Sequence, residues 1–184
     1  MLARLASQNA HKLGELRLAL PGWTIDPIVG EAPDETGDTY EANARIKAVW
    51  GRAQAPDVLV IGEDSGIECA ALDGAPGLHS ARWAPGLDQA DALLARLATE
   101  DDRRARMVTV IVAHTPDGRE IVVEGVLEGT LARDRRGTEG FGYDPIFVPL
   151  GETRTVAEIG EAWKNENSHR ARAAHALRDA LSSS

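Results

Sequence analysis

Three adjacent side chains, Glu63, Asp64 and Ser65, are the first candidates for chemistry in this chain. They follow the apolar run 58–61, which is typical of a strand buried on both faces, and glycines flank them. In open α/β sheets, ligands collect at the carboxyl ends of the strands. Proteins usually hold Mg²⁺ beside phosphates with one or two carboxylates and leave water on the ion. The pattern therefore predicts a magnesium platform, although an ordinary acidic turn has the same composition.

A second acidic segment, Asp34–Gly37, offers Glu35 as a further metal ligand or as a residue that positions a water. A solvated loop before a helix cap at Thr39 would have the same sequence. Asn43 and Lys47 lie four residues apart and share one face of the helix predicted to follow. That face either looks into a cleft or carries a solvated lysine.

A polar segment joins the first predicted strand to the first predicted helix, and it comprises Ser7, Gln8, Asn9, Ala10, His11 and Lys12. A helix N-terminus offers free backbone amides and positive potential, which favour a bound phosphate. Lys12 lies in the first helical turn, where a structural residue is more often acidic. The segment lacks the glycines and the Lys-Ser/Thr ending of a Walker A loop. We therefore interpret it as a phosphate-binding segment of another kind.

The stretch Gly137–Phe147 holds both phenylalanines of the chain and one of its two tyrosines. Glycines that let a backbone come close, next to aromatic rings, are suited to a flat heterocycle. We expect Phe147 itself to fill the core. Further along, Lys164 precedes His169 and Arg170, whose side chains offer edge donors and a stacking plane for a base. Taken alone, His169 could equally be a structural residue at a helix start.

Composition bounds the kind of protein. The 184 residues suit one domain, or two small lobes that share a core, and 43% of them are hydrophobic. The sequence shows no apolar run that could span a bilayer, and Cys69 is the only cysteine, which fits a reducing cytoplasm. A net charge of -9 disfavours a general nucleic-acid binder. We expect a cytoplasmic protein without membrane or nucleic-acid partners.

Early strands that alternate with helices, followed by a hairpin, predict an α/β (mixed α+β) fold. Strands are expected at Leu2–Ala6, Trp23–Ile28, Val58–Ile61, Ile67–Ala70, Arg106–His114 and Glu120–Leu131, with a loop over residues 62–66. Helices are expected at Asn9–Leu20, Thr39–Ala53, Asp88–Thr99 and Asn167–Leu181.

Together these segments resemble the inosine triphosphate pyrophosphatase family (RdgB-like purine nucleoside triphosphate pyrophosphatases). The matching pieces come in the family's order over nearly the whole chain: Ser7-Gln8-Asn9 with Lys12, Glu35-Thr36-Gly37, Asn43-Ala44 with Lys47-Ala48, Glu63-Asp64-Ser65-Gly66, Gly74-Ala75-Pro76-Gly77, Ser80-Ala81-Arg82, Gly140-Phe141-Gly142-Tyr143-Asp144-Pro145, and Lys164 with Ser168-His169-Arg170. Each motif is modest alone, but the ordered set is specific.

The resemblance implies a single domain over residues 1–184, with a long central mixed sheet, flanking helices and two lobes around a cleft. It also implies a homodimer and the Mg²⁺-dependent hydrolysis of ITP, dITP and XTP to the monophosphate and pyrophosphate. Asp64 would be the catalytic carboxylate and a metal ligand, with Glu35 as second ligand. Ser7 to Lys12 and Ser65 would hold the phosphates. The nucleotide would be gripped by Phe141, Gly142, Tyr143, Asp144, Lys164, His169 and Arg170, the last two near the base.

Two other functions stay open on the residues. A Maf-like pyrophosphatase would act on pyrimidine or modified nucleotides on a related fold, and the segment Ser168–Arg170 argues against it. A nucleotide sensor without catalysis would use the same binding residues. The pair of Glu35 and Asp64 speaks against a sensor, because carboxylates beside phosphates weaken binding unless a metal ion intervenes.

Overall fold

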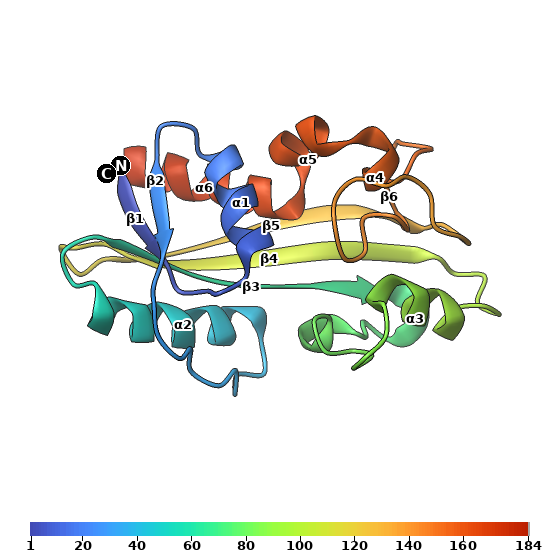
Figure 1. Cartoon of the computed structure of the whole chain (residues 1–184), viewed down its shortest axis with the longest axis horizontal. Helices are drawn as coiled ribbons and strands as arrows, with labels where there is room; N and C mark the ends of the chain where they lie inside the picture. The colour runs from blue at the N-terminus through green and yellow to red at the C-terminus, as the bar shows by residue number, and fades with distance from the viewer. Residues whose placement is uncertain (184) are drawn as a thin grey trace. The chain divides into compact units, whose positions relative to one another are not determined.

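The computed structural model describes residues 1–183, which form a six-stranded sheet in the order β2-β1-β3-β4-β5-β6, with helices on both of its faces (Figure 1). β1 pairs in parallel with β2 and β3, and β6 is antiparallel to β5. The strands are β1 Leu2–Leu5, β2 Thr24–Pro27, β3 Leu59–Cys69, β4 Arg104–His114, β5 Glu120–Leu131 and β6 Phe147–Pro149. The helices are α1 Ala10–Ala19, α2 Tyr40–Gln54, α3 Gln89–Arg96, α4 Val156–Ile159, α5 Glu161–Asn167 and α6 His169–Ser182, with short 3₁₀ turns at Ala70–Leu72 and Gly77–His79. The mixed α/β fold predicted from the sequence is confirmed.

The chain divides into two compact units. The first comprises Met1–Asp64, Thr109–Gly125 and His169–Ser184, of which the structure describes all but the last residue. The second comprises Ser65–Val108 and Val126–Ser168. β3, β4 and β5 each contribute residues to both units. The cleft expected between two lobes stays a prediction.

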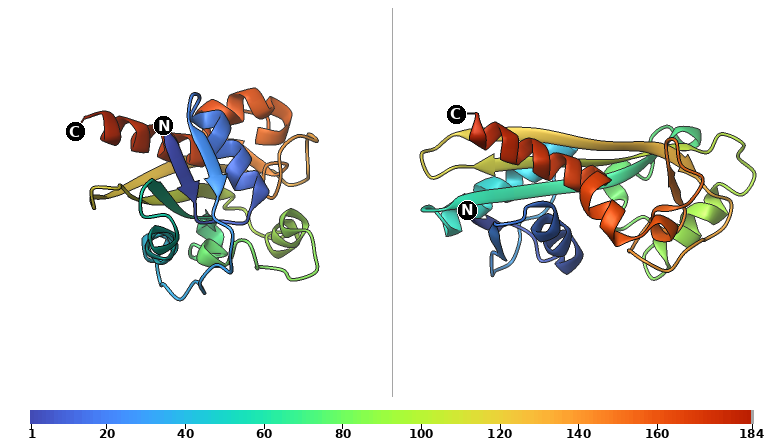
Figure 2. Two further views of the ribbon diagram at one scale, coloured as in Figure 1. Left: turned by 60° about the vertical axis from the view of Figure 1, so that its left-hand side comes forward. Right: turned by 90° about the horizontal axis from the view of Figure 1, so that it is seen from above.

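In the first unit, the strand alternation of β3 assigns its residues to two different helical layers. Leu59 and Ile61 pack with residues of α1 and α6, including Leu16 and Leu177. Val60 lies on the other face, in a cluster that includes partly buried Trp50 of α2. Figure 2 shows α6 in front of the strands and α2 behind them in its right-hand view. Side chains in the first part of β3 therefore face α1 and α6 or α2 in turn.

β3 corrects one prediction. The segment 62–66 was expected to be a loop at the end of a short strand, but β3 runs without a break from Leu59 to Cys69. Gly62 serves packing rather than a turn, because a Cβ there would lie 2.1 Å from the carbonyl oxygen of Ala44 and 2.6 Å from the amide nitrogen of Ala48. The glycine thus lets α2 approach the strand closely.

The predicted helix starts are confirmed by their caps. The side chain of Asn9 accepts hydrogen bonds from the amides of His11 and Lys12, and that of Thr39 accepts one from Ala42. The hairpin between β4 and β5 also forms where it was expected, with Gly118 at φ 90°. Sequence reasoning did not foresee β6, α4 and α5, and it began the last helix at Asn167 instead of His169.

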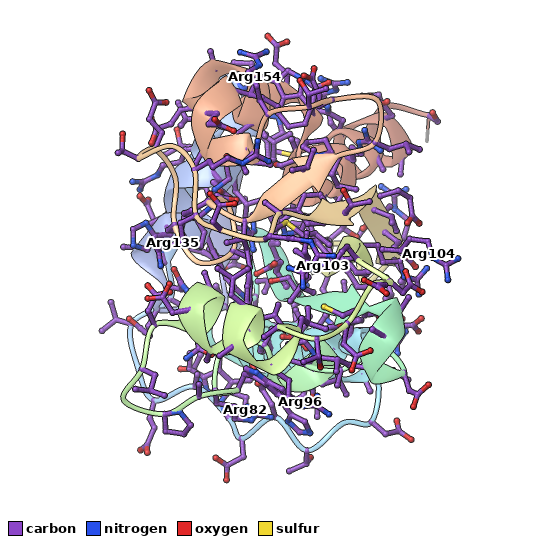
Figure 3. The ribbon with its side chains drawn as sticks, turned by 90° about the vertical axis from the view of Figure 1, so that its right-hand side faces the viewer. Arg82, Arg96, Arg103, Arg104, Arg135 and Arg154 are labelled. Atoms are coloured by element: carbon purple, nitrogen blue, oxygen red, sulfur yellow. The ribbon has the colours of Figure 1, made fainter. Side chains whose placement is uncertain are left out.

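The second unit has its own core, in which α3, β5 and β6 meet. Leu93, Leu127 and Phe147 are buried there, as expected for Phe147. Figure 3 shows six labelled arginines of this unit, and several are held by nearby groups. Arg135 pairs with Asp88 at 2.7 Å, and Arg103 donates to the carbonyl oxygen of Leu97 at 2.8 Å. Among the described residues, no helix is both long and apolar enough to cross a membrane.

Candidate active site

The two adjacent carboxylates of β3, Glu63 and Asp64, point to opposite faces of the strand. Because consecutive residues of a strand point to opposite faces, Glu63 lies on the same side as Ile61, toward α1 and α6. Asp64 lies on the side of Gly62, toward α2. The predicted platform made of both side chains is therefore wrong in its geometry. Each carboxylate has its own set of cationic partners.

Asp64 belongs to a cluster with Lys47 of α2 and Glu35 of the acidic loop. The Lys47 Nζ atom lies 2.5 Å from Glu35 Oε1 and 3.1 Å from Asp64 Oδ1. The same ammonium donates to the backbone oxygen of Glu63 at 3.0 Å. Asn43, one turn before Lys47, donates from Nδ2 to Asp64 Oδ2 at 3.3 Å. One helical face thus holds Asp64 by both of its oxygens.

Burial and charge act together on this cluster. Asp64 is 5% exposed, and its burial raises the pKa of the carboxyl group, with Glu35 adding to the rise while Lys47 and Lys12 oppose it. Burial lowers the pKa of the Lys47 ammonium, but the attraction of Asp64 and Glu35 outweighs it and leaves the pKa raised. A carboxylate with a raised pKa can accept a proton more readily than an exposed one.

The donor set of this cluster suits a hard cation. Carboxylate oxygens are the ligands that Mg²⁺ prefers, and Lys47 already places a positive charge between Glu35 and Asp64. Within residues 1–183, however, no group of three or more His, Cys, Asp or Glu side chains is arranged to hold a metal ion. An ion here would therefore draw its remaining ligands from water and from phosphate oxygens, as Mg²⁺ commonly does.

Glu63 joins a second cluster, in which Glu63 and Arg170 are buried and Lys12 and Glu15 are partly buried. Its Oε2 atom lies 2.8 Å from Lys12 Nζ in α1, and its Oε1 atom accepts from Arg170 of α6 at 3.2 Å. Arg170 also pairs with Glu15 of α1. Burial would raise the pKa of Glu63, but Lys12 and Arg170 outweigh it and hold the pKa well below its usual range. In this cluster two cations and two anions form a chain of ion pairs that connects α1, β3 and α6.

The segment Ser7–Lys12 is built as a helix start. The backbone amides of His11 and Lys12 already donate to the side-chain oxygen of Asn9. A phosphate bound there would therefore contact the Lys12 side chain and the other backbone amides. Gln8 points its amide elsewhere: Nε2 donates to the carbonyl oxygens of Ile28 at 2.8 Å and Gly30 at 3.2 Å. Gln8 therefore connects this segment to residues 28–30, which begin the loop that carries the acidic segment Asp34–Gly37.

In the second unit, the glycine- and aromatic-rich turn comes together with Lys164. The ammonium of Lys164 pairs with Asp144 and lies 4.1 Å from the centroid of the Phe141 ring. Asp144 also accepts from the Phe141 amide at 2.8 Å. Gly140 and Gly142 have φ of 78° and 60°, the left-handed region that favours glycine.

Tyr143 of the same turn is fixed by its hydroxyl, which donates to the carbonyl oxygen of Ser80 at 2.8 Å. Burial raises the pKa of this phenol, so it stays a donor at neutral pH. Ser80 is itself buried and donates to the backbone oxygen of Gly77 at 2.6 Å. The sequence motif at residues 74–82 is thereby linked to the aromatic turn.

The residues proposed from the sequence thus fall into two sets. In the first unit, Lys12 and Arg170 pair with Glu63. Glu35 and Asp64 both pair with Lys47. The first unit also contains Ser7, Gln8, Asn9, Ala10, His11 and His169. The second unit contains Ser65, Phe141, Gly142, Tyr143, Asp144 and Lys164.

Sequence reasoning noted Glu63, Asn43 and Lys47 but gave them no role in the final proposed site, and it did not consider Glu15. The four-residue spacing of Asn43 and Lys47 was the available signal, because a shared helical face with a buried lysine needs an anionic partner. Glu15 carried no signal, since an acidic residue one turn into a helix is usually solvated.

The structure defines a mixed α/β protein with two clusters of ion-paired side chains, one around Asp64 and one around Glu63. The chain belongs to the Ham1 family, whose model matches residues 3–180. A dITP/XTP pyrophosphatase of Symbiobacterium thermophilum is 50% identical over 178 residues, which cover 92% of this chain and 89% of the relative. A dITP/XTP pyrophosphatase of Streptomyces coelicolor is 46% identical over 187 residues, covering 94% and 93%.

Solved structures agree with this assignment. The Ham1 protein of Staphylococcus aureus superposes with a TM-score of 0.87 at 33% identity and covers 100% of this chain and 99% of that one. A HAM1 protein from Coxiella burnetii gives the same TM-score of 0.87 at 35% identity, with full coverage of both chains. The resemblance inferred from the ordered motifs is confirmed.

Proposed function

We propose that this chain hydrolyses dITP, ITP and XTP to the nucleoside monophosphate and pyrophosphate, and so removes these nucleotides from the precursor pool. The observation that carries the proposal is the buried cluster of Asp64, Lys47 and Glu35 in a chain 50% identical to a dITP/XTP pyrophosphatase. A protein that only binds a triphosphate would gain nothing from two carboxylates at this place unless a metal ion lay between them and the phosphates.

Asp64 is the proposed general base. Its raised pKa and its two fixed oxygens suit a carboxylate that takes a proton from the attacking water. Lys47 holds Glu35 and Asp64 in place and offsets their mutual repulsion. Lys12 brings positive charge toward the phosphates, where it stabilises the leaving pyrophosphate. Mg²⁺, bound by Asp64 and Glu35, would supply charge stabilisation for the phosphoryl oxygens.

Base selection is assigned to the aromatic turn and the start of α6. Phe141 and Tyr143 offer apolar ring surface, and His169 and Arg170 are the proposed contacts near the base. A site built to hydrogen-bond a 6-keto group and N1–H leaves groups unpaired when an amino base enters, so ATP is expected to be rejected strongly. The resemblance also leads us to propose a homodimer in the cytoplasm.

The function is tested with a panel of ITP, dITP, XTP, GTP, ATP and dTTP, in which phosphate and pyrophosphate are measured separately. We expect pyrophosphate from ITP, dITP and XTP, with at least about 10²-fold lower kcat/KM for ATP. Preferred turnover of dTTP would instead favour a Maf-like enzyme. Tight ITP binding without any product would favour a sensor.

A further inference from the structure

Asn43 lies between the two carboxylate-bearing segments and is almost fully shielded from solvent. It is 1% exposed and sits in the second turn of α2. Through Nδ2 it donates to Asp64 Oδ2 at 3.3 Å. Through Oδ1 it accepts from the backbone amide of Gly37 at 2.8 Å. A single buried amide thus joins β3 to the loop that carries Glu35.

The fit between Gly37 and α2 is close. A Cβ at Gly37 would lie 2.6 Å from Ala42 Cβ, 2.8 Å from Asn43 Oδ1 and 2.9 Å from the Asn43 backbone nitrogen. The loop therefore rests directly on the first turns of the helix. Gln8 holds the beginning of the same loop at Ile28 and Gly30, some residues before Glu35. Gly37 lies two residues after Glu35, so the bond to Asn43 fixes the loop next to the carboxylate itself.

The chemistry of an amide suits this junction. Asn carries a donor and an acceptor on one rigid group, and here each meets its complement: a carboxylate oxygen and a backbone N–H. Aspartate at this place would keep the bond to Gly37, but it would put a third carboxylate beside Asp64 and Glu35. A buried hydrogen-bonding group with both sides satisfied holds its partners in one arrangement.

We propose that Asn43 is a positioning residue that sets the Glu35 and Asp64 carboxylates relative to each other for a divalent cation. It orients Asp64 directly and Glu35 through Gly37. The inference rests on the proposed function, since it takes these two carboxylates as the metal ligands. Groups that orient metal ligands commonly change metal affinity by about 10–100-fold when they are removed.

The test compares wild type with Asn43→Ala by two measurements. Binding of Mn²⁺ alone is followed by the electron paramagnetic resonance signal of the free ion, without nucleotide. The Mg²⁺ concentration that half-activates pyrophosphate release from ITP is measured separately. We expect both constants to rise by about 10–100-fold in Asn43→Ala, with KM for ITP at saturating Mg²⁺ changed much less.

A second variant tests the loop alone. Gly37→Ala places a Cβ too close to Ala42 and Asn43, so the loop must move away from α2, whereas the Asn43 side chain that donates to Asp64 is still present. We therefore expect weaker Mn²⁺ binding, but a smaller change than in Asn43→Ala. Thr39→Ala is the matched control, because it removes the side-chain cap of the same helix, whereas the backbone bond from Asn43 to the Thr39 carbonyl oxygen and both side-chain bonds of Asn43 are kept. It should lower the unfolding temperature and leave Mn²⁺ binding unchanged.

The outcomes separate this inference from the proposed function. Equal Mn²⁺ affinity in wild type and Asn43→Ala overturns the positioning role, even if the variant loses activity, and so does an equal loss in Thr39→Ala. If Asn43→Ala does not fold, unchanged Mn²⁺ binding in Gly37→Ala overturns it. A wild type that binds Mn²⁺ but releases no pyrophosphate contradicts the function alone, and the Mn²⁺ comparison still decides the role of Asn43.

Discussion

Lys47 is the residue on which the electrostatics of the proposed catalytic carboxylate depend. Lys47 is 7% exposed, and its ammonium pairs with both Glu35 and Asp64. Burial and Glu35 raise the pKa of Asp64, while Lys47 is the foremost group that opposes the rise. The pKa of Asp64 thus depends on opposing effects, and Lys47 is the main group that lowers it.

Replacement of Lys47 shifts this balance in a known direction. In Lys47→Met the pKa of Asp64 rises further, because the neighbouring positive charge is lost while burial and Glu35 remain. The acid limb of kcat/KM for ITP should therefore move to higher pH, by about one unit or more. Arg45→Met is the control, since Arg45 pairs on the outside of the same helix with Glu41 and Glu120. An unchanged acid limb in Lys47→Met would contradict the assignment of Asp64 as the base.

At the scale of elements, the site depends on how closely α2 packs on β3. Gly62 leaves room for this contact. Next to it, Asp64 of the strand meets Asn43 and Lys47 of the helix. Without the close approach, the helical face that holds Asp64 would stand away from the strand.

Two glycines give a matched prediction. A Cβ at Gly62 would fall 2.1 Å from the backbone oxygen of Ala44, whereas a Cβ at Gly14 in α1 would have nothing within 4 Å. Gly62→Ala should lower the free energy of unfolding by about 1–3 kcal/mol or more through overpacking. Gly14→Ala should raise it by about 0.5–1 kcal/mol, because alanine loses less conformational entropy than glycine when the chain folds into the helix. Urea unfolding measures both, and equal effects of the two changes would contradict the packing argument.

The elements differ in how well the sequence predicts them. Helix caps at Asn9 and Thr39 and the turn at Gly118 are local, so their residues alone indicate them. The continuity of β3 is not local: Gly62 resembles a turn residue until the backbone of α2 is placed against it. The short elements between residues 147 and 167 depend on the core around Phe147, which no short sequence pattern specifies.

The same distinction applies to the site. Asp64, Glu35 and Lys12 could be proposed because charged residues near predicted strand ends and helix starts point to ligands. The separation of Glu63 from Asp64 follows from strand alternation, which the expected loop concealed. The partnership of Glu63 with Arg170 joins residues 107 positions apart, and no spacing in the sequence reveals it.

At the scale of the whole molecule, the net charge is -9, and several exposed arginines pair with carboxylates. Arg104 pairs with Asp102 at 2.6 Å and Arg135 with Asp88 at 2.7 Å, and both arginines are labelled in Figure 3. The negative net charge disfavours binding to a phosphate backbone, which agrees with the expectation that nucleic acid is not a partner. That expectation stays a prediction.

The buried cluster around Glu63 should contribute to the stability of the folded chain. Glu63→Gln leaves Lys12 and Arg170 with a neutral partner, and breaking a buried ion pair costs about 3–5 kcal/mol. The folded pKa of Glu63 is depressed, so its contribution is present above the unfolded value of 4.5 and is lost as the pH falls below it.

Chemical denaturation at several pH values tests this contribution. The difference in unfolding free energy between wild type and Glu63→Gln should be largest near pH 7 and should shrink below about pH 4.5. A difference that is independent of pH would mean that packing, and not charge, holds the cluster together.

The central claim is tested most directly by the rate of pyrophosphate release from ITP, with and without Mg²⁺, in wild type and in Asp64→Asn. The variant keeps the size of the side chain and removes its charge. We predict release that requires Mg²⁺ in wild type and a fall of about 10²–10⁴-fold or more in Asp64→Asn, with the fold retained. A variant that releases pyrophosphate at the wild-type rate would contradict the account, because Asp64 could then be neither the base nor an essential metal ligand.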